Sequence, residues 1–348
     1  VTLQATAPAT ITISEYQWTQ SVTFPSNGTW TSFTSGQTIS LSTGDGNWYL
    51  HVRATDSAGN NSTATSAAFV LDNTAPVTSA TLAPTSPDGD NDWYVSNVTV
   101  TLAATDGGSA VATTEYNLDG STTWLTYPTE GIEFTTDSNH TVYYRSTDTA
   151  GNIETTKTVS FKIDTTNPTI TEVTGNPTSW TKEDVILTVT ASDSGSGLAA
   201  EAYSFDNGAT WQVSNQKTFT SSQDVDIKVK DAAGNISNLT TIEIVKIDKV
   251  SPVIELSQDP TTATKNDVTI SATVTDVDSG VDEVKWASDT QTVSYFETGG
   301  TLLTLVEGTY SFDVATNGTY TVYAKDQAGN ESVETITFNN IVTDGPQI

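Results

Sequence analysis

The segment ATDSAGNNS at residues 54–62 decides the fold, because three close copies of it follow along the chain. They read STDTAGNIE at 146–154, VKDAAGNIS at 229–237 and AKDQAGNES at 324–332. All four contain the pattern Asp-x-Ala-Gly-Asn, called the turn motif below. Its aspartates are spaced 92, 83 and 95 residues apart and are Asp56, Asp148, Asp231 and Asp326. A motif that returns at this spacing predicts tandem units of one architecture.

An opening motif with an early aspartate and a closing proline follows each of the first three turn motifs. It reads LDNTAP at 71–76, IDTTNP at 163–168 and IDKVSP at 247–252. These motifs predict four repeats, with boundaries at 1–71, 72–163, 164–247 and 248–343. Residues 344–348 are expected to start a further strand A or to form a linker.

Two more motifs recur inside the repeats. A middle motif reads ATDGGSAV at 104–111, ASDSGSGL at 191–198 and VTDVDSGV at 274–281. An aromatic motif reads EYNLDGSTTW up to Trp124 and AYSFDNGATW up to Trp211. The first repeat has Pro8-Ala9 where the others carry the middle aspartate, and the fourth has an insert around residues 288–309 instead of the aromatic motif.

Each repeat is predicted to consist of β-strands. The runs Val98–Leu102, Val185–Thr190 and Val268–Val274 alternate with a period of two and are rich in β-branched residues. About seven such strands in roughly 90 residues are typical of an immunoglobulin-like sandwich. The predicted fold class is all-β, with four tandem immunoglobulin-like β-sandwich domains. We expect them to form an extended rod, because the proline of each opening motif stiffens the junction.

Composition excludes several classes of function. The 348 residues include 13 Lys and Arg against 42 Asp and Glu, which gives a net charge of −29. Such a charge disfavours nucleic acid and anionic membranes as partners, and it suits divalent cations. The chain has no Cys, only two His, and no uninterrupted apolar run of about 20 residues for membrane insertion. Without a nucleophile elbow, a zinc-protease motif or a phosphate loop, the sequence predicts a protein that is not an enzyme.

The chain resembles bacterial extracellular Ig-like repeats, which occur in tandem in large adhesins, S-layer proteins and secreted polysaccharide-degrading enzymes. The resemblance is carried by the opening motif, by the aromatic motif with its Tyr-x-x-Asp-Gly…Trp pattern, and by the turn motif with the preceding Arg at Arg53 and Arg145. It covers essentially the whole chain. It implies an extracellular or cell-surface location, and partners that are neighbouring domains, like subunits or extracellular polysaccharide.

The aspartates of the three motifs are expected to converge. In an immunoglobulin sandwich the start of strand A, the B–C loop and the F–G loop lie at one pole. The expected sets are Asp72, Asp106 and Asp148; Asp164, Asp193 and Asp231; and Asp248, Asp276 and Asp326, with Asp278 beside them. Three carboxylates repel one another unless a cation lies among them, and Ca²⁺ binds six to eight oxygens. We therefore expect Ca²⁺ as a cofactor at the domain joints, and the resemblance to adhesin and cadherin-like rods implies that it stiffens them.

The same residues admit a purely structural interpretation. Asp and Asn favour turns because they accept hydrogen bonds from backbone N–H groups, and glycine supplies the left-handed conformation. On this alternative the turn motif is a hairpin loop, and the opening aspartate caps a strand. The sequence leaves both interpretations open.

Aromatic residues supply a second candidate site. Trp124 and Trp211 recur at matching positions, which indicates packing in the core. Trp93, Tyr94 and Trp180 precede a strand B, and we expect them to be exposed and able to stack on carbohydrate.

The predicted function is that of a non-catalytic spacer of a secreted or cell-surface bacterial protein, made rigid by Ca²⁺ at its domain joints. One alternative is an accessory, carbohydrate-binding region of a secreted polysaccharide-degrading enzyme. Another is a subunit of a head-to-tail filament or S-layer lattice. For that assembly, the C-terminal residues of one subunit would complete the first repeat of the next, which begins at strand B with Val1.

Overall fold

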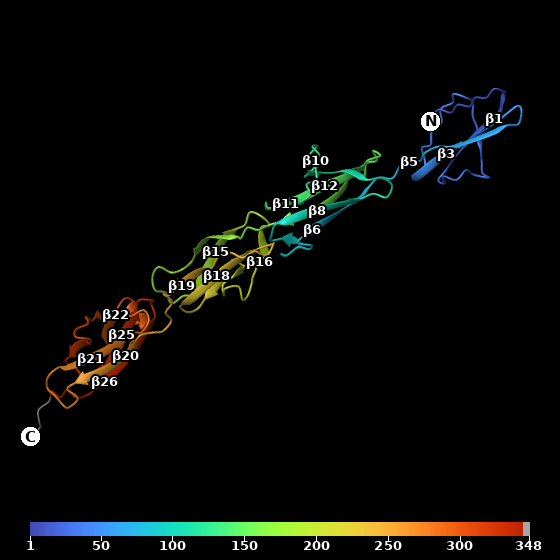
Figure 1. The fold of residues 1–348 in the computed structure, drawn as a ribbon. Helices are drawn as coiled ribbons and strands as arrows, with labels where there is room; N and C mark the ends of the chain where they lie inside the picture. Colours follow the sequence, from blue (N-terminus) through green and yellow to red (C-terminus); the bar gives the residue numbers. More distant parts are fainter. Residues whose placement is uncertain (344–348) are drawn as a thin grey trace, which may run out of the picture. The chain divides into compact units, whose positions relative to one another are not determined.

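The computed structural model describes residues 1–343, and almost all regular structure in them is β-strand (Figure 1). Residues 344–348, expected to start a strand or linker, lie outside the described residues. Within residues 1–343 the only helix is the 3₁₀ helix η1, Val293–Glu297. No helix in this part of the chain has the length and apolarity that a membrane crossing needs. The chain divides into two compact units, residues 1–165 and residues 166 onward.

The second repeat shows the architecture in full. One sheet has the order β11-β8-β6 and the other the order β10-β9-β12-β13-β7, in which β7 joins β13 in parallel. These strands correspond to A, B and E facing A′, C′, C, F and G of an immunoglobulin-like sandwich. They are β6 (Val77–Ala83), β7 (Trp93–Tyr94), β8 (Val98–Thr105), β9 (Val111–Leu118), β10 (Leu125–Thr126), β11 (Ile132–Phe134), β12 (Ser138–Asp148) and β13 (Lys157–Ile163).

The first repeat, in the same unit, is less complete. Its sheet has the order β2-β1-β3-β4, with β5 also paired to β3. The first residues of the chain pair with residues 37–39, as a strand B pairs with a strand E, through the bridge between Thr2 and Thr38. The strands are β1 (Ile11–Thr19), β2 (Thr31–Ser32), β3 (Gly46–Asp56), β4 (Asn61–Thr65) and β5 (Phe69–Leu71).

The third repeat, in the second unit, is a smaller sandwich with sheet orders β14-β15-β17 and β16-β18-β19. Its strands are β14 (Thr169–Thr174), β15 (Val185–Ser192), β16 (Leu198–Ser204), β17 (Gln216–Phe219), β18 (Gln223–Asp231) and β19 (Thr240–Ile244).

The fourth repeat has the sheets β20-β21-β24 and β23-β22-β25-β26. Its insert contributes η1 and β23. Its strands are β20 (Val253–Asp259), β21 (Val268–Thr275), β22 (Val281–Ser288), β23 (Thr301–Leu302), β24 (Tyr310–Val314), β25 (Gly318–Asp326) and β26 (Glu331–Phe338).

The period-two runs produce the cores, as the sequence predicts. In β8 the side chains of Val98 and Val100 are fully buried, and the threonine between them faces outward and stays partly accessible. Val268 and Ile270 of β21 follow the same rule. The five clusters of buried hydrophobic residues each lie within one predicted repeat. The all-β prediction is therefore confirmed, whereas the repeat boundaries, four-domain count and rod shape stay predictions.

Candidate metal centres

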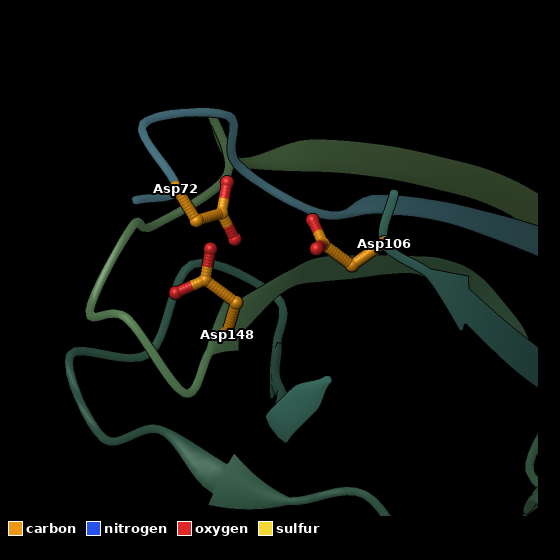
Figure 2. Close-up of side chains that lie close together, drawn as sticks. All are labelled: Asp72, Asp106 and Asp148. Carbon is orange, nitrogen blue, oxygen red and sulfur yellow. The ribbon is translucent and has the colours of Figure 1, made fainter. Parts of the chain in front are cut away.

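Three segments distant in sequence bring aspartates together in the second repeat. Asp72 follows β5, Asp106 follows β8 directly, and Asp148 is the last residue of β12. Figure 2 shows the carboxylates of Asp72 and Asp148 facing each other, with the carboxylate of Asp106 approaching from the side. Asp248, Asp276 and Asp326 form the same arrangement around β21 and β25 of the fourth repeat. In each triad, one oxygen from every carboxylate lies within 4.8 Å of the others.

This spacing fits one calcium ion. Oxygens bound to the same Ca²⁺ at about 2.4 Å can lie at most about 4.8 Å apart. Mg²⁺ suits such a site less well, because it demands near-ideal octahedral geometry and gives up its water reluctantly. Three carboxylates that bind through one oxygen each supply three of the six to eight oxygens that Ca²⁺ takes, and backbone carbonyls and water can supply the rest.

Hydrogen bonds to the second-repeat triad leave part of it unsatisfied. Asp72 accepts the backbone N–H of Thr74 at 3.1 Å, and Asp106 accepts those of Gly108 and Ser109 at 2.9 and 2.7 Å. These bonds engage Oδ1 in both residues. The Oδ2 atoms of Asp72 and Asp106 are buried and have no hydrogen-bond partner within residues 1–343. A buried carboxylate oxygen without a donor is costly, and a cation would remove that cost.

The Asp72 carboxylate packs closely against Gly108, where a larger residue would overlap it. A Cβ on residue 108 would lie 2.5 Å from Oδ1 of Asp72 and 2.6 Å from its Cγ. Asp72 is only 8 % exposed, so its carboxylate has little room to move away. The neighbouring Gly107 has open space where its own Cβ would lie.

In the fourth repeat Asp248 and Asp276 differ in proton affinity. Burial raises the pKa of Asp276, and the negative charges of Asp248 and Asp326 raise it further, against the hydrogen bond from Gly280. Burial also opposes ionisation of Asp248, but hydrogen bonds from Ser279 and Val250 hold the pKa of that carboxyl below its ordinary value. At an effective dielectric constant near 20, each pair of charges at this separation repels by on the order of 3 kcal/mol. Asp276 therefore needs a compensating cation more than Asp248 does.

The turn aspartates hold their own loops. Asp148 accepts the backbone N–H of Asn152 at 2.8 Å and its side-chain amide at 2.7 Å. Burial of Asp148 opposes ionisation, but these bonds keep the pKa of its carboxyl below the ordinary value. Asp326 bonds the backbone and side chain of Asn330 in the same way, at 2.8 Å each. The turn interpretation is thus correct for the turn motif, although it does not account for the buried Oδ2 atoms of Asp72 and Asp106.

The asparagine of the turn motif has a role that sequence reasoning missed. Asn152 Nδ2 also donates to the backbone carbonyl of Asp72 at 3.1 Å, and Asn330 Nδ2 donates to that of Asp248 at 2.9 Å. The asparagine therefore ties the opening segment to the F–G loop. Its recurrence in all four turn motifs was the available signal.

The remaining predicted ligands are the aspartates of the third repeat and Asp278. In the third repeat Asp231 holds its turn through Asn235, and Oδ1 of Asp193 is buried without a partner within residues 1–343. Asp164 is fully buried at the end of the first unit. Asp278 is exposed and does not belong to the Asp248 triad.

The predicted carbohydrate residues need a correction. Tyr94 is 2 % exposed and packs in the core against Phe161, because β7 pairs with β13 and turns Tyr94 inward. It is therefore not available for stacking on a sugar. Trp93 and Trp180 are half-buried, and the ammonium of Lys162 lies 5.0 Å from the Trp93 ring centroid.

The recurring tryptophans also differ from expectation, because they lie outside the core clusters. Trp124 stacks on the guanidinium of Arg145 at 4.1 Å, and Arg145 is paired with Glu115. Trp30 and Arg53 repeat the arrangement in the first repeat at 4.3 Å. In the third repeat, the ammonium of Lys230 lies over Trp211 at 4.8 Å.

No family model matches the chain, and no curated protein matches it. Among solved structures, Sidekick-1 immunoglobulin domains 1–5 align at a TM-score of 0.34 and 13 % identity, over 86 % of this chain and 67 % of that one. The FN1-FN3 domains of chicken CNTN1 align at 0.23 and 14 %, over 74 % and 97 %. A Bacteroides ovatus protein, SGBP-B of a mixed-linkage glucan utilization locus in complex with a heptasaccharide, aligns at 0.20 and 14 %, over 77 % and 71 %.

Likenesses at these TM-scores carry no argument about function. The sheet orders of the chain itself are those of tandem immunoglobulin-like β-sandwiches.

Proposed function

We propose that the chain is a non-catalytic spacer of a secreted or cell-surface protein, and that Ca²⁺ bound by the aspartate triads makes its repeats rigid. The observation that carries the proposal is the pair of buried, unpartnered oxygens on Asp72 and Asp106 beside Asp148. A turn needs only the oxygens that accept backbone N–H groups. A cation bound among the three carboxylates accounts for the unpartnered oxygens most simply.

Calcium at these positions would act mechanically. Each triad joins the opening segment of a repeat to its B–C and F–G loops, since its aspartates come from all three. A bound ion would hold the opening segment against the body of its repeat and so restrict motion at the junction. The expected dissociation constant is about 10⁻⁴–10⁻³ M, the range of extracellular calcium modules, so extracellular calcium would keep the sites filled.

A bacterial surface is the proposed setting, with an adhesin stalk or a surface layer as the specific role. The negative net charge and the recurring motifs of the sequence support it. An accessory region of a secreted polysaccharide-degrading enzyme is the alternative. The two settings differ in whether a catalytic domain is joined to this array.

Isothermal titration calorimetry of the full chain with CaCl₂, after chelation, tests the proposal. We expect saturable binding, and we expect Asp106→Asn and Asp276→Asn each to remove one site. Asp278→Asn is the matched control, because Asp278 lies in the same loop as Asp276 but outside the triad. Asp56→Asn is the control for the turn motif, since Asp56 belongs to no triad.

Small-angle scattering on the same samples tests rigidity. Calcium should narrow the distribution of interatomic distances in the wild type, and this effect should weaken in the triad variants. Absence of calcium binding at millimolar concentration would refute the metal sites. An unchanged number of bound ions in both triad variants would place the ions elsewhere.

A further inference from the structure

The fourth repeat contains a cavity of about 510 Å³ at the end opposite its triad. Tyr320, near the start of β25, lines the cavity, whereas Asp326 of the triad ends the same strand. Other lining residues come from the end of β22, the end of β24 and the insert, defined as residues 288–309. The volume lies within the range of small-molecule sites, about 300–1,000 Å³. The proposed calcium role makes no use of this cavity.

The insert is fixed to the body of the repeat. Phe296 of η1 is 1 % exposed and stacks on Tyr323 of β25, with ring centroids 5.0 Å apart and an interplanar angle of 13°. Tyr323 lies three residues before the turn aspartate, where the first two repeats have Arg53 and Arg145 beneath a tryptophan. The insert therefore replaces the tryptophan–arginine pair with an aromatic anchor of its own.

Two glycines of the insert pack closely against the aromatic rings beside the cavity. A Cβ on Gly299 would lie 2.9 Å from the Tyr295 ring, and a Cβ on Gly300 would lie 2.6 Å from the Phe296 ring. Gly300 also has a φ of +85°, a conformation that favours glycine. Tyr295 lines the cavity and remains 42 % exposed. Its ring is thus an accessible apolar surface at the cavity wall.

Trp286 and Asp313, which also line the cavity, each contact a neighbouring side chain. Trp286 stacks on Phe312 with ring centroids 4.1 Å apart, which fixes its indole. Asp313 is exposed and accepts the hydroxyl of Thr269 at 2.6 Å through Oδ1. Ser288, Thr301 and Thr316 add hydroxyl groups to the wall.

The chemistry of this lining selects the class of ligand. None of the lining residues is Lys or Arg, which disfavours a phosphate, a sulfate or an acidic sugar. An exposed aromatic ring stacks on the C–H face of a pyranose, and hydroxyls with one carboxylate oxygen accept and donate bonds to sugar hydroxyls. We propose that this cavity binds a neutral oligosaccharide, with Tyr295 as the stacking platform and Asp313 as a hydrogen-bond acceptor.

Calorimetric titration of the full chain tests this site with cellohexaose, laminarihexaose, xylohexaose, mannohexaose and maltohexaose. At least one should bind saturably. Tyr295→Ala should weaken that binding at least tenfold, whereas Tyr295→Phe should keep it within about threefold, because the ring remains. Asp313→Asn should weaken binding less than Tyr295→Ala does.

Three controls distinguish binding at this cavity from binding elsewhere on the chain and from loss of the fold. Trp124→Ala removes a half-buried aromatic ring of the second repeat and should leave the affinity unchanged. Asp276→Asn should also leave it unchanged, since the triad lies at the other end of β25. An unchanged thermal unfolding midpoint shows that Tyr295→Ala keeps the fold.

Failure of all five oligosaccharides to bind at millimolar concentration would overturn the proposal. Equal affinity of wild type and Tyr295→Ala would also overturn it. Each result is independent of calcium binding.

Discussion

The first and second repeats carry the same turn motif in different surroundings. Asp56 accepts the backbone N–H groups of Ala58 and Asn60 at 2.9 Å and the side-chain amide of Asn60 at 2.9 Å. Asp148 makes the corresponding bonds to Asn152, yet it is 2 % exposed, whereas Asp56 remains half-buried. The first repeat forms this turn without an opening or a middle aspartate. The turn motif therefore needs no metal, and only the two added aspartates call for one.

The fourth repeat extends the comparison, because the pKa values of Asp248 and Asp276 are shifted in opposite directions. The pKa of Asp276 is raised by burial and by its two charged neighbours, whereas hydrogen bonds outweigh burial and lower the pKa of Asp248. Evenly solvated turn residues would not divide in this way. The first repeat thus serves as an internal control for each experiment on the second and fourth.

The largest expected effect comes from removing a turn aspartate. Asp326→Ala leaves the buried N–H and amide of Asn330 without their acceptor and should destabilise the fourth repeat by about 3 kcal/mol. Asp56→Ala should cost less, because its loop is open to water, which replaces the lost acceptor. Hydrogen–deuterium exchange of peptides from β25 and from β3 measures both changes. Equal losses in the two repeats would mean that burial of the turn has no energetic consequence.

Calcium binding should stabilise the second and fourth repeats but not the first, by nearly as much as loss of a turn aspartate destabilises. At a free concentration 100 times the dissociation constant, a bound ligand stabilises by about 2.7 kcal/mol, so exchange in the F–G loops of the second and fourth repeats should slow by up to about 100-fold. The F–G loop of the first repeat, around Gly59, should be unaffected. Magnesium at the same concentration should protect less, because it needs shorter bonds. Equal protection in all three loops would contradict site-specific binding.

The strands and the identity of the triad residues could be predicted from sequence because both depend on local patterns. Alternation in β8 and β21 sets which side chains face the core, and loop position sets where Asp106 and Asp276 lie. Errors arose where pairing between distant segments decides the outcome. Tyr94 turns inward because β7 joins β13. Trp124 lies outside the core because its ring stacks on Arg145 of β12.

The contacts of the turn asparagine could not be predicted either. Asn152 reaches the carbonyl of Asp72, 80 residues away in sequence, and no local pattern encodes that bond. The same holds for Phe296, whose partner Tyr323 lies on a strand outside the insert. Composition gave no sign of the cavity in the fourth repeat, because its walls come from four separate segments.

Gly108→Ala should sharpen the comparison by disturbing one triad without removing a ligand. The added Cβ would overlap the Asp72 carboxylate and displace it, so we expect calcium affinity at the second repeat to fall about tenfold. Gly107→Ala is the matched control, because its Cβ meets nothing within 4 Å. Calorimetry of the two variants provides the measurement. Equal affinities would mean that the position of Asp72 does not matter for binding.

The smallest expected effect comes from the charge of Asp276. Removing that charge should change the free energy of unfolding of the fourth repeat in opposite directions with and without calcium. Between the ordinary aspartate pKa of 3.8 and the raised folded value, native Asp276 keeps a proton that the unfolded chain has lost. Calcium-free protein should therefore lose stability as the pH rises through this interval.

Asp276→Asn keeps an acceptor for Gly280 and removes the charge, so near neutral pH it should stabilise the calcium-free fourth repeat by on the order of 1 kcal/mol. In saturating calcium the same variant should be less stable than the wild type, because it gains nothing from the ion. Urea unfolding monitored by exchange in β25 measures both. Lower stability of the variant under both conditions would show that Asp276 serves only its turn.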